Sequence, residues 1–355
     1  MRRVPVHPAA WWAWALALGS MALVTSNPLL LIALGLVAAT VGTLRRSPTG
    51  SQAALGSFLV LGAWVVGIRV AFQVVFGLRL PGHVLVALPQ LQLPSWLAGV
   101  SLGGAVTAES LLAATVAGLK LAVALVAFGA ANAVASPREL VRILPQSLAA
   151  LSTAISVALA FVPSLLVGIA EQREARLLRG RPVRGFAGWR AMAIPALEGS
   201  LRSSTALAAS MAARGYGGQG LSEARVPAPL LSLGLLGLGA ATAGSYLLAY
   251  PTVPAAAAAS LASLGLAAMG AVVVLGARKV ARTRYRPAPF GLSSLATLAT
   301  AAMVVAGVLT ARVVEPTSVS WNPYSWTAPT LGWLAMASAL LALAPLAWSD
   351  QELVR

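Results

Sequence analysis

Long apolar stretches separated by short polar connections make up most of the chain. About 20 apolar residues cross a bilayer as an α-helix. By this rule the chain has about eight spans, near residues 9–24, 28–44, 53–76, 111–134, 229–248, 255–277, 292–311 and 331–348. The first two are joined by the sequence TSNP, in which Asn-Pro ends the helix. The pattern predicts an all-α, polytopic membrane protein.

A more polar segment, residues 136–227, separates the fourth span from the fifth. It contains eleven arginines and five glutamates, too many for membrane spans alone. It divides the chain into N-terminal spans (1–135), the polar segment (136–227) and C-terminal spans (228–355). We expect the polar segment to lie in the cytoplasm and to form amphipathic helices.

Two long helices are predicted within the polar segment. Apolar residues recur at steps of three and four from Leu148 to Ile169, which is one helical face. The same helix becomes highly charged beyond Gly168, and Pro163 is expected to kink it. A second helix carries apolar residues on one face and small residues, which permit close helix crossing, between residues 194 and 212.

Both long helices end in an arginine followed by a glycine, at Arg179-Gly180 and Arg214-Gly215. A glycine just past a helix end commonly adopts the left-handed conformation. An arginine in the last turn interacts favourably with the helix dipole. Each pair alone is therefore an ordinary helix end. Two matched ends in one segment favour docking, because a planar guanidinium can bind a carboxylate through two hydrogen bonds.

The basic residues fix the expected orientation. Arg2, Arg3, Arg45, Arg46, the polar segment and residues 277–287 all fall on one side of the predicted spans, and the other connections are nearly uncharged. The positive-inside rule therefore predicts a multi-pass cell-membrane protein with both termini in the cytoplasm. The basic start followed by an apolar run also resembles a cleaved signal peptide. The run continues past a cleavage site, which favours a retained first span.

Composition limits the chemistry. Only 10% of the 355 residues are charged, 58% are hydrophobic, and cysteine is absent, which excludes disulfides and thiolate metal sites. The net charge of +16 fits cytoplasmic loops better than nucleic-acid binding, because no basic soluble domain with stacking aromatics is present.

Catalytic and cofactor motifs are missing from the sequence. It has no Walker loop, no HExxH motif and no metal-ligand spacing, so we expect no catalytic residue, no resident metal and no cofactor. Arg69 and Lys120 lie inside predicted spans, either near a span end or on a pathway. Glu109 is expected to be an interfacial residue at a helix start or to pair with a base such as Arg79.

The segments FVPSLLVGIAEQREARLLRG (161–180) and IPALEGSLRSSTALAASMAARGYGG (194–218) resemble the transmembrane T component of energy-coupling factor transporters, which are ABC-type importers. That family carries two Ala-Arg-Gly motifs at the ends of cytoplasmic coupling helices. The motifs HP (7–8), SPREL (136–140) and GLKL (118–121) add weaker likeness. The resemblance covers about the first two-thirds of the chain.

The resemblance implies a non-catalytic scaffold that transmits the ATP-driven motion of two ABC-type ATPases to a separate substrate-binding (S) membrane subunit for a vitamin or a transition-metal ion. Arg179, Gly180, Ala213, Arg214 and Gly215 would then dock the ATPases. Arginine would supply the ionic anchor, glycine would end each helix, and Ala213 would allow close approach.

The sequence departs from the family pattern in three ways. Leu178 stands where alanine is usual, and Arg176 stands where glutamine is common. Four apolar spans also follow the second motif, to which the resemblance gives no role. Two other functions remain open: a stand-alone carrier or channel without an ATPase, and a structural membrane protein whose basic loops bind anionic lipid. Neither needs the paired Arg-Gly ends.

Overall fold

The chain forms two compact units in the computed structural model. Unit 1 comprises Met1–Leu140 and Arg286–Arg355, and unit 2 comprises Val141–Tyr285. The structure describes residues 6–45, 54–76, 82–87, 89, 91–92, 101–135, 139–141, 149–180, 185–215, 228–247, 255–278, 290–325 and 327–348.

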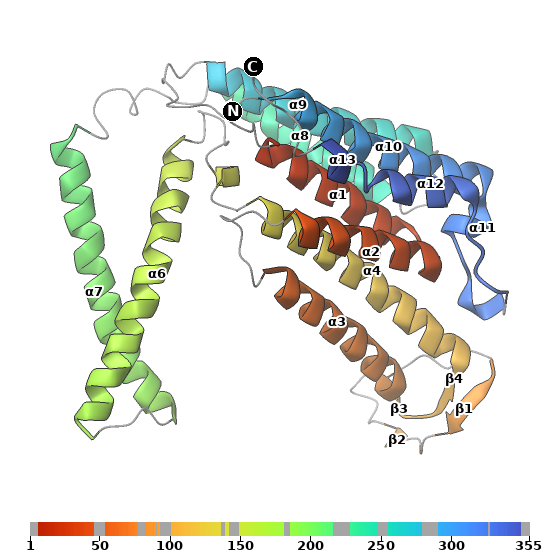
Figure 1. Ribbon diagram of the computed structural model, residues 1–355, viewed down its shortest axis with the longest axis horizontal. Helices are drawn as coiled ribbons and strands as arrows, with labels where there is room; N and C mark the ends of the chain where they lie inside the picture. The colour runs from red at the N-terminus through yellow and green to blue at the C-terminus, as the bar shows by residue number, and fades with distance from the viewer. Residues whose placement is uncertain are drawn as a thin grey trace. The chain divides into compact units, whose positions relative to one another are not determined.

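Helices from both ends of the chain build unit 1 (Figure 1). The first four are α1 (Pro8–Val24), α2 (Pro28–Leu44), α3 (Ala54–Phe76) and α4 (Ala108–Val134). The later ones are α10 (Leu292–Val314), α11 (Pro316–Val319), the 3-10 helix η3 (Pro323–Ser325), α12 (Trp333–Leu341) and α13 (Pro345–Trp348). The boundaries of α1, α2 and α3 agree with the predicted spans to within one residue.

Helix α4 is central to unit 1, because α1, α2 and α3 all pack against it. Glycines bring the backbones close. A Cβ atom on Gly118 would lie 2.9 Å from the Cα of Val66 in α3, and one on Gly42 in α2 would lie 2.9 Å from Ala130. Small residues at such crossings give helices in a membrane their packing contacts.

The last helices of the chain complete this core. Helix α10 packs on α1 and α12, and α12 packs on α2. The turn between α1 and α2 is bound by the segment around α11, since the buried Asn27 side chain donates to the carbonyls of Ser318 (2.9 Å) and Thr330 (2.8 Å). The hydroxyl of Thr25 donates to the carbonyl of Val319 at 2.7 Å. The C-terminal helices of unit 1 are thus structural.

Further long-range hydrogen bonds join the N-terminal helices to the C-terminal ones. The backbone N–H of His7 donates to the Ser294 hydroxyl at 2.9 Å, and the Trp14 indole donates to the Ala342 carbonyl at 3.1 Å. The Arg45 guanidinium donates to the carbonyl of Leu346. His7 also caps α1, which explains the His-Pro sequence at its start.

The connection between α3 and α4 contains strands that the sequence pattern did not predict. Strands β1 (Val84–Ala87) and β4 (Ala105–Thr107) pair antiparallel, as do β2 (Leu91–Gln92) and β3 (Ser101–Leu102). These short strands are a local exception in a structure that is otherwise consistent with the all-α prediction. The alternation of apolar and polar residues that predicts a strand is absent here, because apolar residues occupy both faces.

The last predicted span is interrupted. Helix α12 ends at Leu341, and α13 begins at Pro345 after a turn. Proline has no N–H and its ring clashes with the carbonyl four residues earlier, so a continuous helix over 331–348 is disfavoured.

Unit 2 consists of two helix pairs. One is α6 (Ala149–Leu178) with α7 (Gly185–Ala213), and the other is α8 (Ala228–Leu247) with α9 (Ala255–Arg278). The second pair is tightly packed at two glycines. A Cβ atom on Gly244 would lie 2.4 Å from the Ala262 nitrogen, and one on Gly265 would lie 2.3 Å from the Ala241 nitrogen.

Four helices of the described part are long and apolar enough to cross a membrane: α3, α4, α6 and α10. Shorter apolar helices include α1 and α2. The chain is accordingly a predominantly α-helical membrane protein. Helix α6 differs from the cytoplasmic amphipathic helix predicted, because it is long and apolar enough to cross a membrane. Its charges all follow Ala170, as the sequence indicates.

Several predicted features lie outside the described residues. They are Arg2, Arg3, Arg46, most of the basic connection 277–287, and the first three residues of the SPREL motif.

Candidate functional site

The first Arg-Gly pair closes helix α6 as the sequence predicts. The helix ends at Leu178, and Gly180 has a φ of +66°. Its N–H donates to the carbonyl of Leu177 at 3.0 Å. A Cβ atom at Gly180 would meet nothing within 4 Å. The requirement for glycine is therefore its left-handed backbone, which side chains rarely adopt, rather than lack of space.

The second pair ends α7 in the same way. Gly215 has a φ of +76°, and its N–H donates to the carbonyl of Ala212 at 2.9 Å. The N–H of Arg214 donates to Met211 at 3.1 Å. Space around Gly215 is open as well. Two helices of different sequence thus end with the same backbone conformation.

Both arginines are presented outward. Arg179 and Arg214 are exposed, and among the described residues neither forms an ion pair. Leu178 is 83% exposed beside Arg179, while the exposed Ala213 precedes Arg214. Each end therefore offers a cation and an apolar contact to a partner.

The two ends lie far from each other. Only six residues join α6 to α7, and the helices cross near that connection (Figure 1). Met192, close to the start of α7, is the one buried side chain among those described in this pair, and most of the others are exposed. Helix α7 has 29 residues, about 43 Å at 1.5 Å per residue. Its Arg-Gly end is therefore at the opposite end of the pair from that of α6, too far away for one groove to hold both.

Substituting the two end glycines tests the backbone requirement. Gly180→Ala with Gly215→Ala is expected to destabilise the α6–α7 pair by roughly 1–2 kcal/mol per site, because an L side chain is strained in the left-handed region. Gly199→Ala is the matched control: Gly199 lies inside α7 with open space around it, so alanine should stabilise the helix. Amide hydrogen exchange of α6 and α7 measures both effects. Equal effects at the three glycines would contradict this account.

The two basic residues inside the spans do not form one site. The Lys120 ammonium donates to the Ser26 hydroxyl at 3.1 Å, in the turn between α1 and α2. Arg69 is exposed on α3, and its Cβ lies beside Gly118 of α4. Positions 118 and 120 are about 200° apart around a helix, so Arg69 and Lys120 face different sides of α4.

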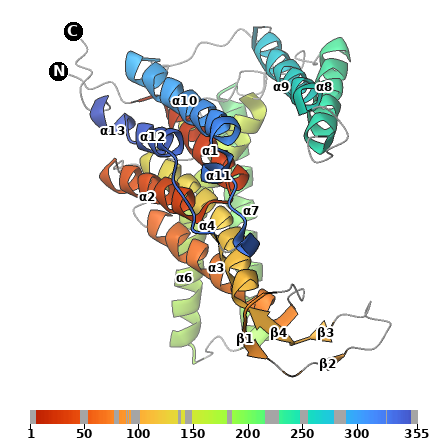
Figure 2. The ribbon, with the colours of Figure 1, turned by 90° about the vertical axis from the view of Figure 1, so that its right-hand side faces the viewer.

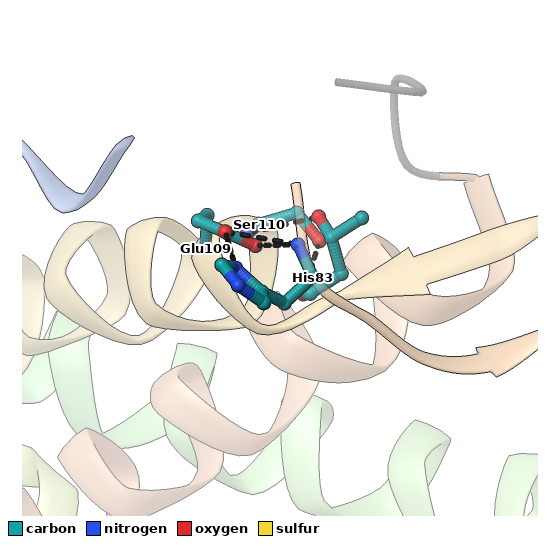
Figure 3. A network of polar contacts seen from close by, with 4 residues as sticks. His83, Glu109 and Ser110 are labelled. Carbon is teal, nitrogen blue, oxygen red and sulfur yellow. Dashed lines mark hydrogen bonds and ion pairs between the residues drawn. The ribbon is translucent and has the colours of Figure 1, made fainter. Parts of the chain in front are cut away.

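Sequence reasoning missed the partner of Glu109. This buried carboxylate, at the start of α4, accepts hydrogen bonds from the His83 backbone N–H at 3.0 Å, and one oxygen lies 2.9 Å from the ring Nδ1 (Figure 3). The His83 carbonyl accepts from the Ala108 N–H at 2.9 Å. Arg79, the base considered from sequence, lies outside the described residues. The one feature of the sequence that relates to this contact is Gly82, next to His83. Any larger residue at position 82 would collide with the Glu109 carboxylate, because a Cβ atom there would lie 2.3 Å from it.

Removing this carboxylate should loosen strand β1. We expect Glu109→Ala to speed amide exchange in Val84–Ala87 by about tenfold, the effect of losing hydrogen bonds worth roughly 1–2 kcal/mol. Ser110→Ala removes a neighbouring hydroxyl that bonds only within the helix start, to the Thr107 carbonyl, and should leave the strand protected. Equal protection of the strand in both variants would contradict this role of Glu109.

The described residues contain no cluster of three His, Asp or Glu side chains that could hold a metal ion. No family model matches the chain, and no curated protein is significantly similar to it.

Proposed function

We propose that the chain is the membrane scaffold of an ATP-driven importer, of the kind to which the T component of energy-coupling factor transporters belongs. The observation that carries the proposal is the pair of exposed arginines at two helix ends with matching left-handed glycines. In this role Arg179 and Arg214 are the ionic anchors for two ABC-type ATPases. Gly180, Ala213 and Gly215 shape the two ends.

The separation of the two ends supports two ATPase subunits rather than one. About 43 Å of helix lies between the connection of α6 with α7 and the second end. Each end would enter a groove on a different ATPase, and closure of the ATPase pair on ATP binding would move α6 and α7 against each other. The small contact between these helices, confined to their crossing, allows such movement.

The exposed apolar surface of α6 and α7 supports a further membrane partner. The side chains of Leu166, Leu197 and Leu201 are each more than 60% exposed. In the proposed importer, this surface contacts the bilayer and the substrate-binding membrane subunit, which moves when the coupling helices move. The cargo, a vitamin or a transition-metal ion, would be bound by that subunit.

The orientation belongs to the same proposal. With the basic connections in the cytoplasm, α6 and α7 reach the ATPases from a prokaryotic cytoplasmic membrane, and both termini are cytoplasmic. Co-expression with candidate cassette ATPases tests the proposal: two ATPase subunits should co-purify with one chain. Transport into vesicles by the purified chain alone would instead favour a stand-alone carrier or channel.

A further inference from the structure

The antiparallel pair of β1 and β4, called here the apolar ribbon, exposes hydrophobic side chains outside the helices. Val84, Leu85 and Val86 are 57%, 60% and 54% exposed. The pairing of β1 with β4 shifts register between Val84 and Val86, and beyond this bulge Val86 and Ala87, both exposed, point to opposite faces. Both faces of β1 are therefore apolar and uncovered, whereas Val106 and Thr107 of β4 are buried. Soluble proteins protect such strands with charges, prolines or covering elements.

Charge protection is absent from this connection. Residues 80–108 contain no Asp, Glu, Lys or Arg, and His83 is the one titratable side chain among them. An isolated two-stranded ribbon is marginally stable in water. The exposed strand β1 of the ribbon therefore needs an apolar environment that reaches both of its faces.

Hydrogen bonds hold the ribbon at the ends of two helices long enough to span a membrane. Its first strand is bound to the start of α4 through His83 and Glu109. Gly103, which precedes its second strand, donates its N–H to the carbonyl of Val75 at 3.0 Å, near the end of α3. Figure 2 shows the strands leaving the ends of α3 and α4 to one side.

The length of α4 determines how deep in the bilayer the base of the ribbon lies, that is, the end of the ribbon that is bound to the start of α4. Its 27 residues extend about 40 Å, close to the 40–45 Å of a bilayer including the headgroups. The base of the ribbon therefore falls in the interfacial zone. There the open strand edges can still bond to water and headgroups, which hydrocarbon would not allow.

We propose that the apolar ribbon inserts its β1 side chains into the membrane interface and anchors the α3–α4 connection to lipid. The bilayer surrounding α3 and α4 is continuous with the ribbon's position and can solvate both of its faces. A protein partner would cover one face. This inference is independent of the proposed function and of which leaflet is involved.

The absence of cysteine allows a clean labelling test. Single spin labels at Val86→Cys and Ala87→Cys report the two faces of β1, in vesicles of phosphatidylethanolamine and phosphatidylglycerol. Leu61→Cys, exposed on α3, is the lipid reference, and Arg173→Cys, in the charged end of α6, is the aqueous reference. Collisions with oxygen and with a water-soluble nickel chelate are measured at each site.

Both ribbon labels should give oxygen-to-nickel collision ratios near that of Leu61, at least about tenfold above that of Arg173. Adding Val86→Asp to the Ala87→Cys protein should lower its ratio towards the Arg173 value. If both labels collide with the nickel chelate as often as the label at Arg173 does, the proposal is overturned. Shielding of one label from both reagents would overturn it too, since it would indicate a second copy of the chain on that face.

Discussion

Reversing both charges at the helix ends, Arg179→Glu with Arg214→Glu, is expected to abolish co-purification of the cassette ATPases from a chain that still inserts normally. Each arginine is exposed and has no ion-pair partner in the described part of the chain, so the change should cost the fold little. Reversing one charge of a docked pair costs roughly 2–5 kcal/mol of binding free energy. Each single variant should weaken retention by at least about 30-fold, and the double variant by the product.

Arg173→Glu with Arg202→Glu is the matched control. These arginines are exposed on the same two helices, Arg173 six residues before Arg179 and Arg202 twelve residues before Arg214, and the net charge changes by the same amount. The control should retain the ATPases. Equal loss in both double variants would mean that overall charge, rather than the two helix ends, attracts the ATPases.

Replacing Asn27 with alanine is expected to produce the largest loss of stability in unit 1. The side chain is fully buried and donates to two carbonyls, those of Ser318 and Thr330. Its oxygen accepts from the Leu29 N–H at 3.0 Å and caps α2. Asn27→Ala leaves these groups unpaired and should cost roughly 2–4 kcal/mol of unfolding free energy. A lower thermal midpoint of the purified chain in detergent measures the loss.

Asn322→Ala provides the comparison, because Asn322 is exposed in the connection after α11. It should change the midpoint little. An Asn27 variant as stable as the Asn322 variant would show that the contact between the α1–α2 turn and the C-terminal segment contributes little to the fold.

The sequence predicts the helices of this protein well, because their signal is local. Apolar runs of the required length, together with proline at the starts of α1 and α2, place both ends of these helices to within one residue. The end glycines were predicted for the same reason, since a helix that stops at Arg-Gly favours a left-handed residue there.

Features that depend on contacts between distant residues could not be predicted. Asn27 was interpreted as a helix breaker alone, although it also binds residues about 300 positions later. The partner of Glu109 was missed because His83 is brought to it by the path of the chain before β1. The interruption of the last predicted span was also missed, but for a different reason: its local signal, Pro345, was present in the sequence.

The geometry of the candidate site was only partly visible in the sequence. Periodicity indicated two long helices and their ends, and the small residues of the second helix indicated a close helix crossing. The uniform apolar surface of the first half of α6 was underestimated, because its leucines and valines were assigned to one face while alanines and serines fill the others.

Cysteine crosslinking at the helix ends tests the central claim most directly. Leu178→Cys and Ala213→Cys place one thiol beside each arginine in a chain that has no other cysteine. In membranes containing the ATPases, each variant should crosslink to one ATPase subunit, and the double variant should crosslink to two at once. Ser204→Cys, exposed inside α7, should give no product. Crosslinks from Ser204→Cys with none from the two ends would contradict docking at the Arg-Gly motifs.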